Sequence, residues 1–239
     1  MKIALIGYGK MGCELEKMIS QMGHSISFIA KDSSWTPQDL CGADTAIEFT
    51  SPDAVLKNIE KALSAKIPLV VGTTGWYDQL ADVQHLVEKN SGTLLYSPNF
   101  SLGVNLFLKI VRHAATLINR FDHYDVGGYE IHHNQKKDSP SGTANAICRE
   151  LLAALDRKTG VQHTSFEGTP DQQILHFPSL RVGHVPGTHT VIADAQEETI
   201  TLTHEARSRS CFARGAILAA DWLQNKKGFF HFDDLFKEF

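Results

Sequence analysis

The sequence predicts an α/β fold in two parts, a parallel sheet with crossover helices followed by an α+β region. Over the first hundred residues, short apolar runs alternate with amphipathic segments of helical period. Such alternation is typical of parallel strands joined by right-handed helical crossovers. After about residue 100 the alternation stops, and β-rich runs separated by turn residues become frequent. A length of 239 residues accommodates one large domain or two modest ones.

The first part contains the elements of a parallel sheet. Its expected strands are the apolar runs 3–6, 26–30, 45–49, 69–71 and 93–96. Its expected helices cover 9–22, 52–65 and 77–89. The first of these helices carries apolar residues at spacings of three and four, and Ser51-Pro52 suits the start of the second. In such sheets ligands bind at the carboxyl ends of the strands.

The second part mixes helices with strands that lack regular alternation. Helices are expected at 104–118, from 141 onward and at 212–225. Strands are expected at 124–133, 174–177, 179–182, 188–193 and 198–204. This pattern indicates an open or mixed sheet with helices beside it.

Composition and charge narrow the function classes. The net charge of −4 gives no basic excess for binding a nucleic-acid backbone. The cysteines are scattered without a Cys-x-x-Cys pair, which favours small core residues over a zinc site or a disulfide framework. With neither a secretory signal nor a run long enough to span a membrane, we expect a cytoplasmic protein that does not bind membranes.

A glycine-rich turn predicts a site for a dinucleotide. The sequence Gly7-Tyr8-Gly9-Lys10-Met11-Gly12 fits the G-x-G-x-x-G pattern, and it follows the first strand and opens the first helix. The glycines allow a tight turn, close approach of a pyrophosphate, and close packing of helix on strand. The helix N-terminus adds free N–H groups and partial positive charge. The alternative is a glycine turn that binds nothing.

The end of the second strand bears on the choice of cofactor. It reads Ala30-Lys31-Asp32, where an acidic side chain would bind a ribose 2′-hydroxyl and a cation would favour a 2′-phosphate. With Lys31 first in line, we expect NADPH or dual use, with NADH remaining an alternative. Two solvated charges with no ligand are a further interpretation.

Two more segments follow strands at the same predicted edge. They are Gly72-Thr73-Thr74-Gly75 and Ser97-Pro98-Asn99-Phe100. Small residues there let a ring lie against the backbone, and hydroxyls or amides can bond a carboxamide. Each alone is explained by turn chemistry, but both fall at one edge. We therefore predict cofactor contacts from both.

The segment Glu130–Ala144 is the densest in reactive side chains. His132 and His133 end a strand, Lys136 follows in a polar loop, and Ser141-Gly142-Thr143 opens a helix. A helix start with hydroxyls binds anions such as carboxylates, and histidine or lysine can supply a proton. The segment predicts a site for a carboxylate substrate that is protonated during reaction.

Simpler interpretations of this segment remain open. The two histidines could form an exposed polar patch, and Ser141 could act only as a helix N-cap. A metal site is not expected, because adjacent positions on a strand point to opposite faces and no third ligand follows at suitable spacing.

The same segment resembles the signature E-x-H-H-x-x-K-x-D-x-P-S-G-T-A of the dihydrodipicolinate reductases. The similarity covers nearly the whole chain. It includes the opening glycine motif, the Gly72–Gly75 turn and Asn99-Phe100-Ser101-Leu102-Gly103-Val104-Asn105. It also includes Arg181, Gly183, Gly187 and His189, then Ser208-Arg209 and Phe212-Ala213-Arg214-Gly215-Ala216.

The resemblance implies roles for individual residues. His132 would donate or accept a proton, Lys136 would be a second proton donor, and His133 would contact the substrate. Ser141, Gly142 and Thr143 would hold a substrate carboxylate. Two positions depart from the family pattern: Gln135 stands where histidine is frequent, and Lys31 stands where an acidic residue is common.

The resemblance further implies architecture and reaction. Residues 1–102 and 213–239 would form a Rossmann-like nucleotide domain, and 103–212 an inserted substrate domain whose sheet builds a homotetramer. The enzyme would reduce 4-hydroxy-tetrahydrodipicolinate to tetrahydrodipicolinate in lysine and diaminopimelate biosynthesis. The rivals are another small-substrate dehydrogenase, such as an amino-acid dehydrogenase, and a dinucleotide-sensing regulator without catalysis.

Overall fold

A computed structural model describes residues 1–238 of the chain, which divide into two compact units. Unit 1 comprises Met1–Leu102 and the segment from Arg209 onward, and unit 2 comprises Gly103–Ser208. The two units meet at 102/103 and 208/209, and the predicted domain boundary at 212/213 stays a prediction. No helix among residues 1–238 has both the length and the apolar content that crossing a bilayer requires.

Unit 1 is built on a parallel sheet, as the strand–helix alternation predicts. Within residues 1–238 the strand order is β12-β5-β4-β3-β1-β2. The strands are β1 (Lys2–Ile6), β2 (Ser25–Ala30), β3 (Thr45–Glu48), β4 (Leu69–Val71), β5 (Thr93–Tyr96) and β12 (Gly228–His231). The order reverses between β1 and β3, and a crevice at such a reversal is the usual ligand site of open α/β sheets.

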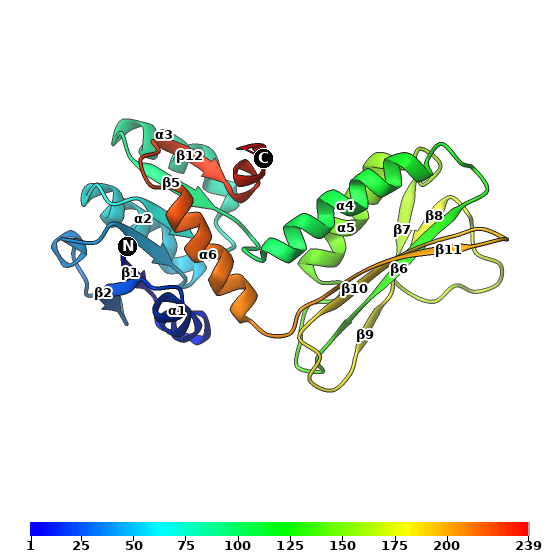
Figure 1. Cartoon of the computed structure of the whole chain (residues 1–239), viewed down its shortest axis with the longest axis horizontal. Coiled ribbons are helices and arrows are strands. Elements are labelled where there is room, and N and C mark those ends of the chain that lie inside the picture. The colour runs from blue at the N-terminus through cyan, green and yellow to red at the C-terminus, as the bar shows by residue number, and fades with distance from the viewer. Residues whose placement is uncertain (239) are drawn as a thin grey trace. The chain divides into compact units, whose positions relative to one another are not determined.

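Helices cover both faces of this sheet. The α-helices are α1 (Lys10–Gln21), α2 (Pro52–Ser64), α3 (Leu80–Lys89) and α6 (Ser210–Trp222); 3₁₀ turns are η1 (Pro37–Leu40), η2 (Tyr77–Gln79) and η3 (Phe232–Glu238). One apolar cluster joins α1 and α6 to one face, and a second joins α2 and α3 to the other (Figure 1). Because side chains alternate along a strand, Leu5 enters the first cluster while Ala4 and Ile6 enter the second.

The strand β12 was not predicted, although it completes the sheet beside β5.

The final helix α6 packs closely against the chain that follows β5, at one glycine. A Cβ on Gly215 would lie 1.7 Å from the carbonyl oxygen of Phe100. This close approach gives a physical reason for the glycine in the Phe212–Ala216 motif.

Unit 2 combines a mixed sheet with two helices on one of its faces (Figure 1). Within the described residues the order is β11-β10-β6-β9, with only β6 and β9 parallel. The elements are α4 (Leu102–Ile118), β6 (Asp125–His132), α5 (Gly142–Ala154), β9 (Ser179–Arg181), β10 (Thr188–Asp194) and β11 (Thr199–Glu205), with a small separate pair β7 (Gly160–Gln162) and β8 (Ile174–His176). The predicted α/β class with a parallel sheet and an α+β region is confirmed.

Candidate functional site

Two glycines of the predicted phosphate turn are required by the fold of unit 1. Gly7 has φ +99°, and a Cβ there would lie 2.0 Å from the carbonyl oxygen of Phe49. A Cβ on Gly12 would lie 2.4 Å from the carbonyl oxygen of Gly7. Residue 12 is buried under the turn. The turn therefore packs against the end of β3 and the start of α1 so closely that side chains cannot be accommodated.

Gly9 differs from Gly7 and Gly12 because the space that a Cβ would take there is empty. It is the N-cap residue of α1, is exposed, and has no atom within 4 Å of the place a Cβ would take. Packing does not demand a glycine here, whereas an approaching ligand would. The first N–H groups of α1 lie beside it, and helix starts of this kind bind phosphate. The residues present thus fit the pyrophosphate of a dinucleotide.

The two charges after β2 are placed differently. The ammonium of Lys31 lies 5.0 Å from the ring centroid of Tyr8, within the glycine turn. Asp32 instead accepts hydrogen bonds from the backbone and hydroxyl of Ser34, and these bonds lower the pKa of its carboxyl. Of the two, Lys31 lies against the phosphate turn, and Asp32 is bonded within its own turn.

The turn after β4 lies at the same edge as the glycine turn. A Cβ on Gly72 would lie 2.1 Å from the ring of Phe49, so the ring fills the space above this glycine. Thr73 is buried and its hydroxyl accepts a hydrogen bond of 2.7 Å from the N–H of Thr50. Thr74 is exposed at this edge.

The segment after β5 is partly internal. The Ser97 hydroxyl is buried, accepting from Asn99 N–H and donating to Asn99 O, while Pro98 is exposed. Phe100 is 2% exposed and packs edge-on against Phe49 and Phe232. The ring of Phe100 therefore supports the edge from the core side.

Sequence reasoning overlooked the end of β3. Glu48 is fully buried at the last position of this strand; its Oε1 accepts from the Thr50 hydroxyl and, at 3.3 Å, from Asn58. Burial raises its pKa, and hydrogen bonds offset only part of this effect. Phe49 then contacts both glycine turns. Nothing in the short run "EFT" distinguishes this support from an ordinary strand end.

In unit 2, the predicted reactive segment folds as a strand end, a loop and a helix start. His132 is the last residue of β6 and is 7% exposed, whereas His133 beside it is half-buried. The loop turns back at once, since the N–H of Lys136 donates to the carbonyl of His133. The Lys136 ammonium pairs with both oxygens of Asp138 at 2.8 and 2.9 Å, and Gln135 is exposed.

The helix start has an inner and an outer part. Ser141 is 2% exposed and caps α5, its hydroxyl accepting from the N–H of Ala144. That hydroxyl also donates to Glu130, as does the Ser141 N–H. Gly142 is exposed, and Thr143 is half-buried. Of the three predicted carboxylate-binding residues, Gly142 and Thr143 therefore lie outermost, while Ser141 faces inward.

Glu130 lies at the centre of this region and was given no role by sequence reasoning. Its carboxylate is completely buried, and Oε1 accepts from Ser179 at 2.7 Å and Arg181 at 3.1 Å, besides the Ser141 N–H. Burial acts to raise its pKa, but hydrogen bonds, those from His189 and Ser141 foremost, outweigh burial and hold the pKa well below its ordinary value.

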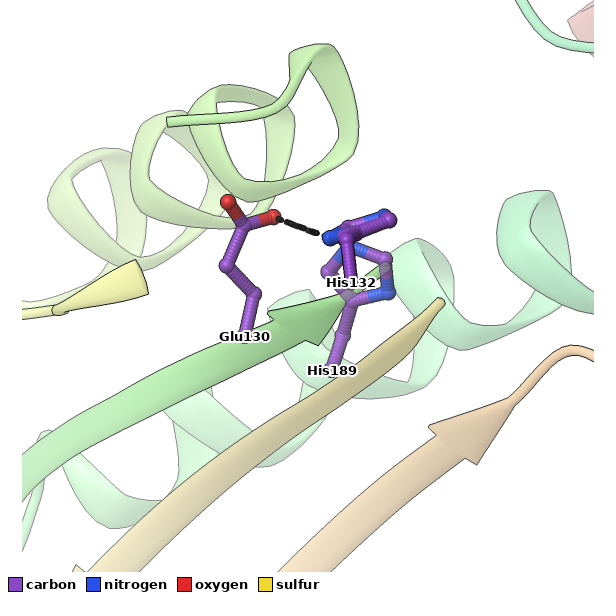
Figure 2. A group of neighbouring side chains, drawn as sticks. All are labelled: Glu130, His132 and His189. Atoms are coloured by element: carbon purple, nitrogen blue, oxygen red, sulfur yellow. Dashed lines mark ion pairs between the residues drawn. The ribbon is translucent and has the colours of Figure 1, made fainter. Parts of the chain in front are cut away.

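Two histidines lie against the second oxygen of Glu130. His132 Nδ1 and His189 Nε2 are each 3.4 Å from Oε2, and the two rings stand edge to face with centroids 5.1 Å apart (Figure 2). Burial lowers the pKa of His132 to about 4; the Glu130 charge opposes this, while His189, Lys136 and Arg181 reinforce it. His132 is thus neutral at physiological pH in this state.

The three side chains also contain the atoms that a metal ion needs. One ligand atom from each of Glu130, His132 and His189 lies within 4.8 Å of the others. The third candidate comes from β10, which short-range spacing could not reveal. Glu130, however, already accepts bonds from a guanidinium and two serines, and a cation there would repel Arg181. That no metal binds at these three residues stays a prediction.

Comparison with known proteins identifies relatives over the full chain. Family models described as dihydrodipicolinate reductase, N-terminus and C-terminus, match residues 1–100 and 103–236. A 4-hydroxy-tetrahydrodipicolinate reductase of Christiangramia forsetii is 38% identical, with 100% of this chain and 98% of that protein covered. One from Staphylococcus aureus strain MRSA252 is 36% identical, with 98% and 100% covered.

Solved structures support the fold. A dipicolinate-bound dihydrodipicolinate reductase from Paenisporosarcina sp. TG-14 matches with a TM-score of 0.75 at 22% identity, covering 98% of this chain and 99% of that one. An amine dehydrogenase from Mycobacterium smegmatis matches with a TM-score of 0.57 at 8% identity, covering 95% and 93%. Both likenesses concern the fold alone. The resemblance inferred from the motifs is confirmed by the family models and the curated relatives.

Proposed function

Because the chain belongs to the dihydrodipicolinate reductase family, we propose that it reduces 4-hydroxy-tetrahydrodipicolinate to tetrahydrodipicolinate with NADPH or NADH. The reaction consumes one reduced nucleotide and one proton, and it releases the oxidised nucleotide and water. The product serves lysine and diaminopimelate biosynthesis. One observation carries the proposal: in unit 2 one buried carboxylate joins a buried histidine to an open helix start, and the loop between them carries a lysine.

The residues of unit 1 would hold the cofactor. The N–H groups at the start of α1, beside Gly9, would bind the pyrophosphate, and Tyr8, Lys10 and Met11 would border it. When bound, the reduced nicotinamide supplies a hydride. The exposed Thr74 and Pro98 lie on the turns that follow β4 and β5, at the carboxyl edge where the sheet order predicts the ligand.

The residues of unit 2 would bind the dicarboxylate and deliver the proton. Gly142 and Thr143 would receive one carboxylate at the start of α5, and His133 would contact the substrate. Lys136 would donate a proton or stabilise developing negative charge. His132 is neutral before substrate arrives, and two nearby carboxylates would favour its protonated form. His132 would therefore gain its donor function on binding.

A turnover assay tests the proposal directly. The fresh enzymatic condensation product of pyruvate and aspartate semialdehyde is mixed with NADPH and the protein, and nicotinamide absorbance is followed. We expect steady loss of absorbance. Normal NADPH binding without turnover would contradict the proposal and favour a sensor or another dehydrogenase substrate.

For the cofactor, we infer that NADPH is used at least as well as NADH. The observation in support is Lys31, which lies against the phosphate turn while Asp32 bonds within its own turn. A kcat/KM ratio favouring NADH by tenfold or more, about 1.4 kcal/mol, would overturn this inference.

For assembly, we propose a homotetramer formed through the open face of the unit 2 sheet. Leu180 pairs with Ile131 in register and points away from Glu130, and it is 52% exposed. Val182, the next position on that side, is 56% exposed. Light scattering should give four times the chain mass, and Leu180→Lys should lower it, whereas Leu117→Lys on α4 should not. A monomeric wild type would refute the proposal.

We also place the enzyme in the cytoplasm, where reduced nicotinamide is supplied and free thiols such as its cysteines persist.

A further inference from the structure

Glu130 is an unusual residue for a site that binds an anionic substrate. It is a fully buried carboxylate on β6, held below its ordinary pKa by hydrogen bonds that outweigh burial. An ionised carboxylate removed from water costs several kcal/mol unless it is fully paired. Here the donors are two serine hydroxyls, one backbone N–H and the Arg181 guanidinium. The pairing is complete enough for a permanent negative charge.

The same carboxylate contacts the histidine that the family resemblance makes the proton carrier. His132 Nδ1 is buried, lies 3.4 Å from Glu130 Oε2 as its nearest charged neighbour, and makes no hydrogen bond among the described residues (Figure 2). A carboxylate at this distance favours a proton on Nδ1. The second ring nitrogen, Nε2, is then the one that can exchange a proton with the substrate.

A glycine limits the other side of the imidazole. A Cβ on Gly187 would lie 3.0 Å from His132 Nε2 and 3.3 Å from Cδ2. The ring thus occupies space that any side chain at position 187 would take. His189, two residues later on β10, approaches the same Oε2 at 3.4 Å and the Ser141 hydroxyl at 3.3 Å. These contacts account for Arg181, Gly187 and His189, which the sequence marked without a role.

The carboxylate also reaches the anion-binding helix start. It accepts both the N–H and the hydroxyl of Ser141, the N-cap residue that precedes Gly142. One buried group therefore fixes the proton-carrying ring and the first turn of α5 together. A displacement of either would be transmitted to the other through Glu130.

Resting on the proposed reductase function, we propose that Glu130 is a positioning residue that fixes the Nδ1–H tautomer of His132 and the start of α5. Arg181 and His189 hold Glu130 in place, and the absence of a side chain at Gly187 leaves the His132 ring its space. Glu130 does not touch the substrate. It acts through His132 and Ser141.

The principal test is Glu130→Gln, which keeps the side-chain shape and removes the charge. We expect kcat to fall by about 10²-fold with KM changed less than about threefold, since general acid–base catalysis contributes about 10²–10⁴-fold. The matched control is Glu150→Gln on α5, whose carboxylate pairs with Arg112 at the surface. A folded Glu130→Gln protein with kcat within twofold of wild type would overturn the proposal.

Two further readouts separate positioning from simple structural support. Long-range ¹H–¹⁵N spectra of the imidazoles, with His132 assigned through His132→Gln, should show the Nδ1–H tautomer in wild type and its loss in Glu130→Gln. The limb of the kcat–pH profile that reports protonation of His132 should move to lower pH in Glu130→Gln. The negative charge that raises the His132 pKa is then gone, while His189, Lys136 and Arg181, which lower it, remain. An unchanged tautomer and limb would refute positioning. The spectra need no substrate, so they test Glu130 even if turnover is absent.

If Glu130→Gln does not fold, Gly187→Ala replaces it. This change leaves every donor to Glu130 in place and presses on His132 Nε2. We expect the same loss in kcat with little change in KM. Because Gly187 has φ +158°, the control is Gly168→Ala, where φ is also positive, at +82°, and a Cβ would meet no atom within 4 Å. Equal activity of the two alanine variants would overturn the proposal.

Discussion

Among the residues whose burial is described, each unit buries one glutamate completely, and the pKa values of the two carboxyls are shifted in opposite directions. Glu48 in unit 1 is bonded by neutral groups, retains one oxygen without a partner, and has a raised pKa because burial dominates. Glu130 in unit 2 faces a guanidinium and converging hydroxyls, and its pKa is lowered. Both side chains are 0% exposed, yet their pKa values shift in opposite directions, and Glu130 is the one that faces a cation.

The contrast extends to the surrounding sites. The edge of unit 1 is formed by backbone and glycines, with Glu48 as internal support. The site in unit 2 is formed by side chains around a permanent charge. We therefore expect unit 2 to be sensitive to changes of charge and unit 1 to changes of volume.

The largest effect is expected from His132→Gln combined with Lys136→Ala. Removing both candidate proton donors should lower kcat by about 10⁴-fold, the upper range for general acid–base catalysis. Steady-state rates with saturating NADPH would measure it, and Lys137→Ala in the same exposed loop is the control. A double variant that keeps most of its kcat would show that the assigned roles are wrong.

Replacing the ionised carboxylate should be costly for stability. Glu130→Leu leaves Arg181 without its partner and should lower the free energy of unfolding by about 3–5 kcal/mol. The lowered pKa means that the stability from Glu130 is fully present above its ordinary pKa of 4.5 and is lost as pH falls from there through its much lower folded-state pKa. Denaturant unfolding of wild type and variant should therefore converge at acidic pH. Glu150→Leu should change stability by less than about 1 kcal/mol.

Gly9→Ala tests whether backbone access defines the unit 1 site. Its Cβ meets no atom within 4 Å, so thermal stability should stay close to wild type. Nucleotide affinity should fall by at least about tenfold, because the new methyl occupies the approach to the helix start. Isothermal titration with NADPH measures the affinity. Unchanged binding would indicate that no phosphate lies there.

Lys31→Ala should affect the choice of cofactor more than its binding as such. If Lys31 pairs with a 2′-phosphate, kcat/KM for NADPH should fall by about tenfold, or 1.4 kcal/mol, while the value for NADH stays unchanged. Lys17→Ala on the exposed face of α1 is the matched control. Equal losses with both nucleotides would contradict the proposed contact.

The smallest effect is expected at the other glutamate. Glu48→Gln removes a buried acid whose pKa is raised in the folded state. Such a group stabilises the fold fully below its ordinary pKa of 4.5, and this stabilisation is lost as pH rises through the folded-state pKa. At neutral pH the amide should stabilise by about 1 kcal/mol, or roughly 2–4 °C in Tm. Calorimetry should show the difference shrinking toward pH 4. A destabilised variant at neutral pH would show that the charge is needed.

Local patterns predicted much of this protein. Strand–helix alternation and the glycine turn predicted the parallel sheet, and the His132–Thr143 segment identified the family. The strand β12 was missed because four residues after two lysines carry too little periodicity. The role of Glu130 was missed because Arg181 lies 51 positions away and becomes a neighbour only through strand pairing.

The discontinuity of unit 1 has a consequence for biosynthesis of the chain. The ribosome releases β5 well before β12, and all of residues 103–208 are made in between. During that interval the apolar strand Thr93–Tyr96 presents an unpaired edge, the kind of edge that invites aggregation. Slowing translation within 103–208 should prolong this exposure, and chaperone dependence should grow with the length of the pause.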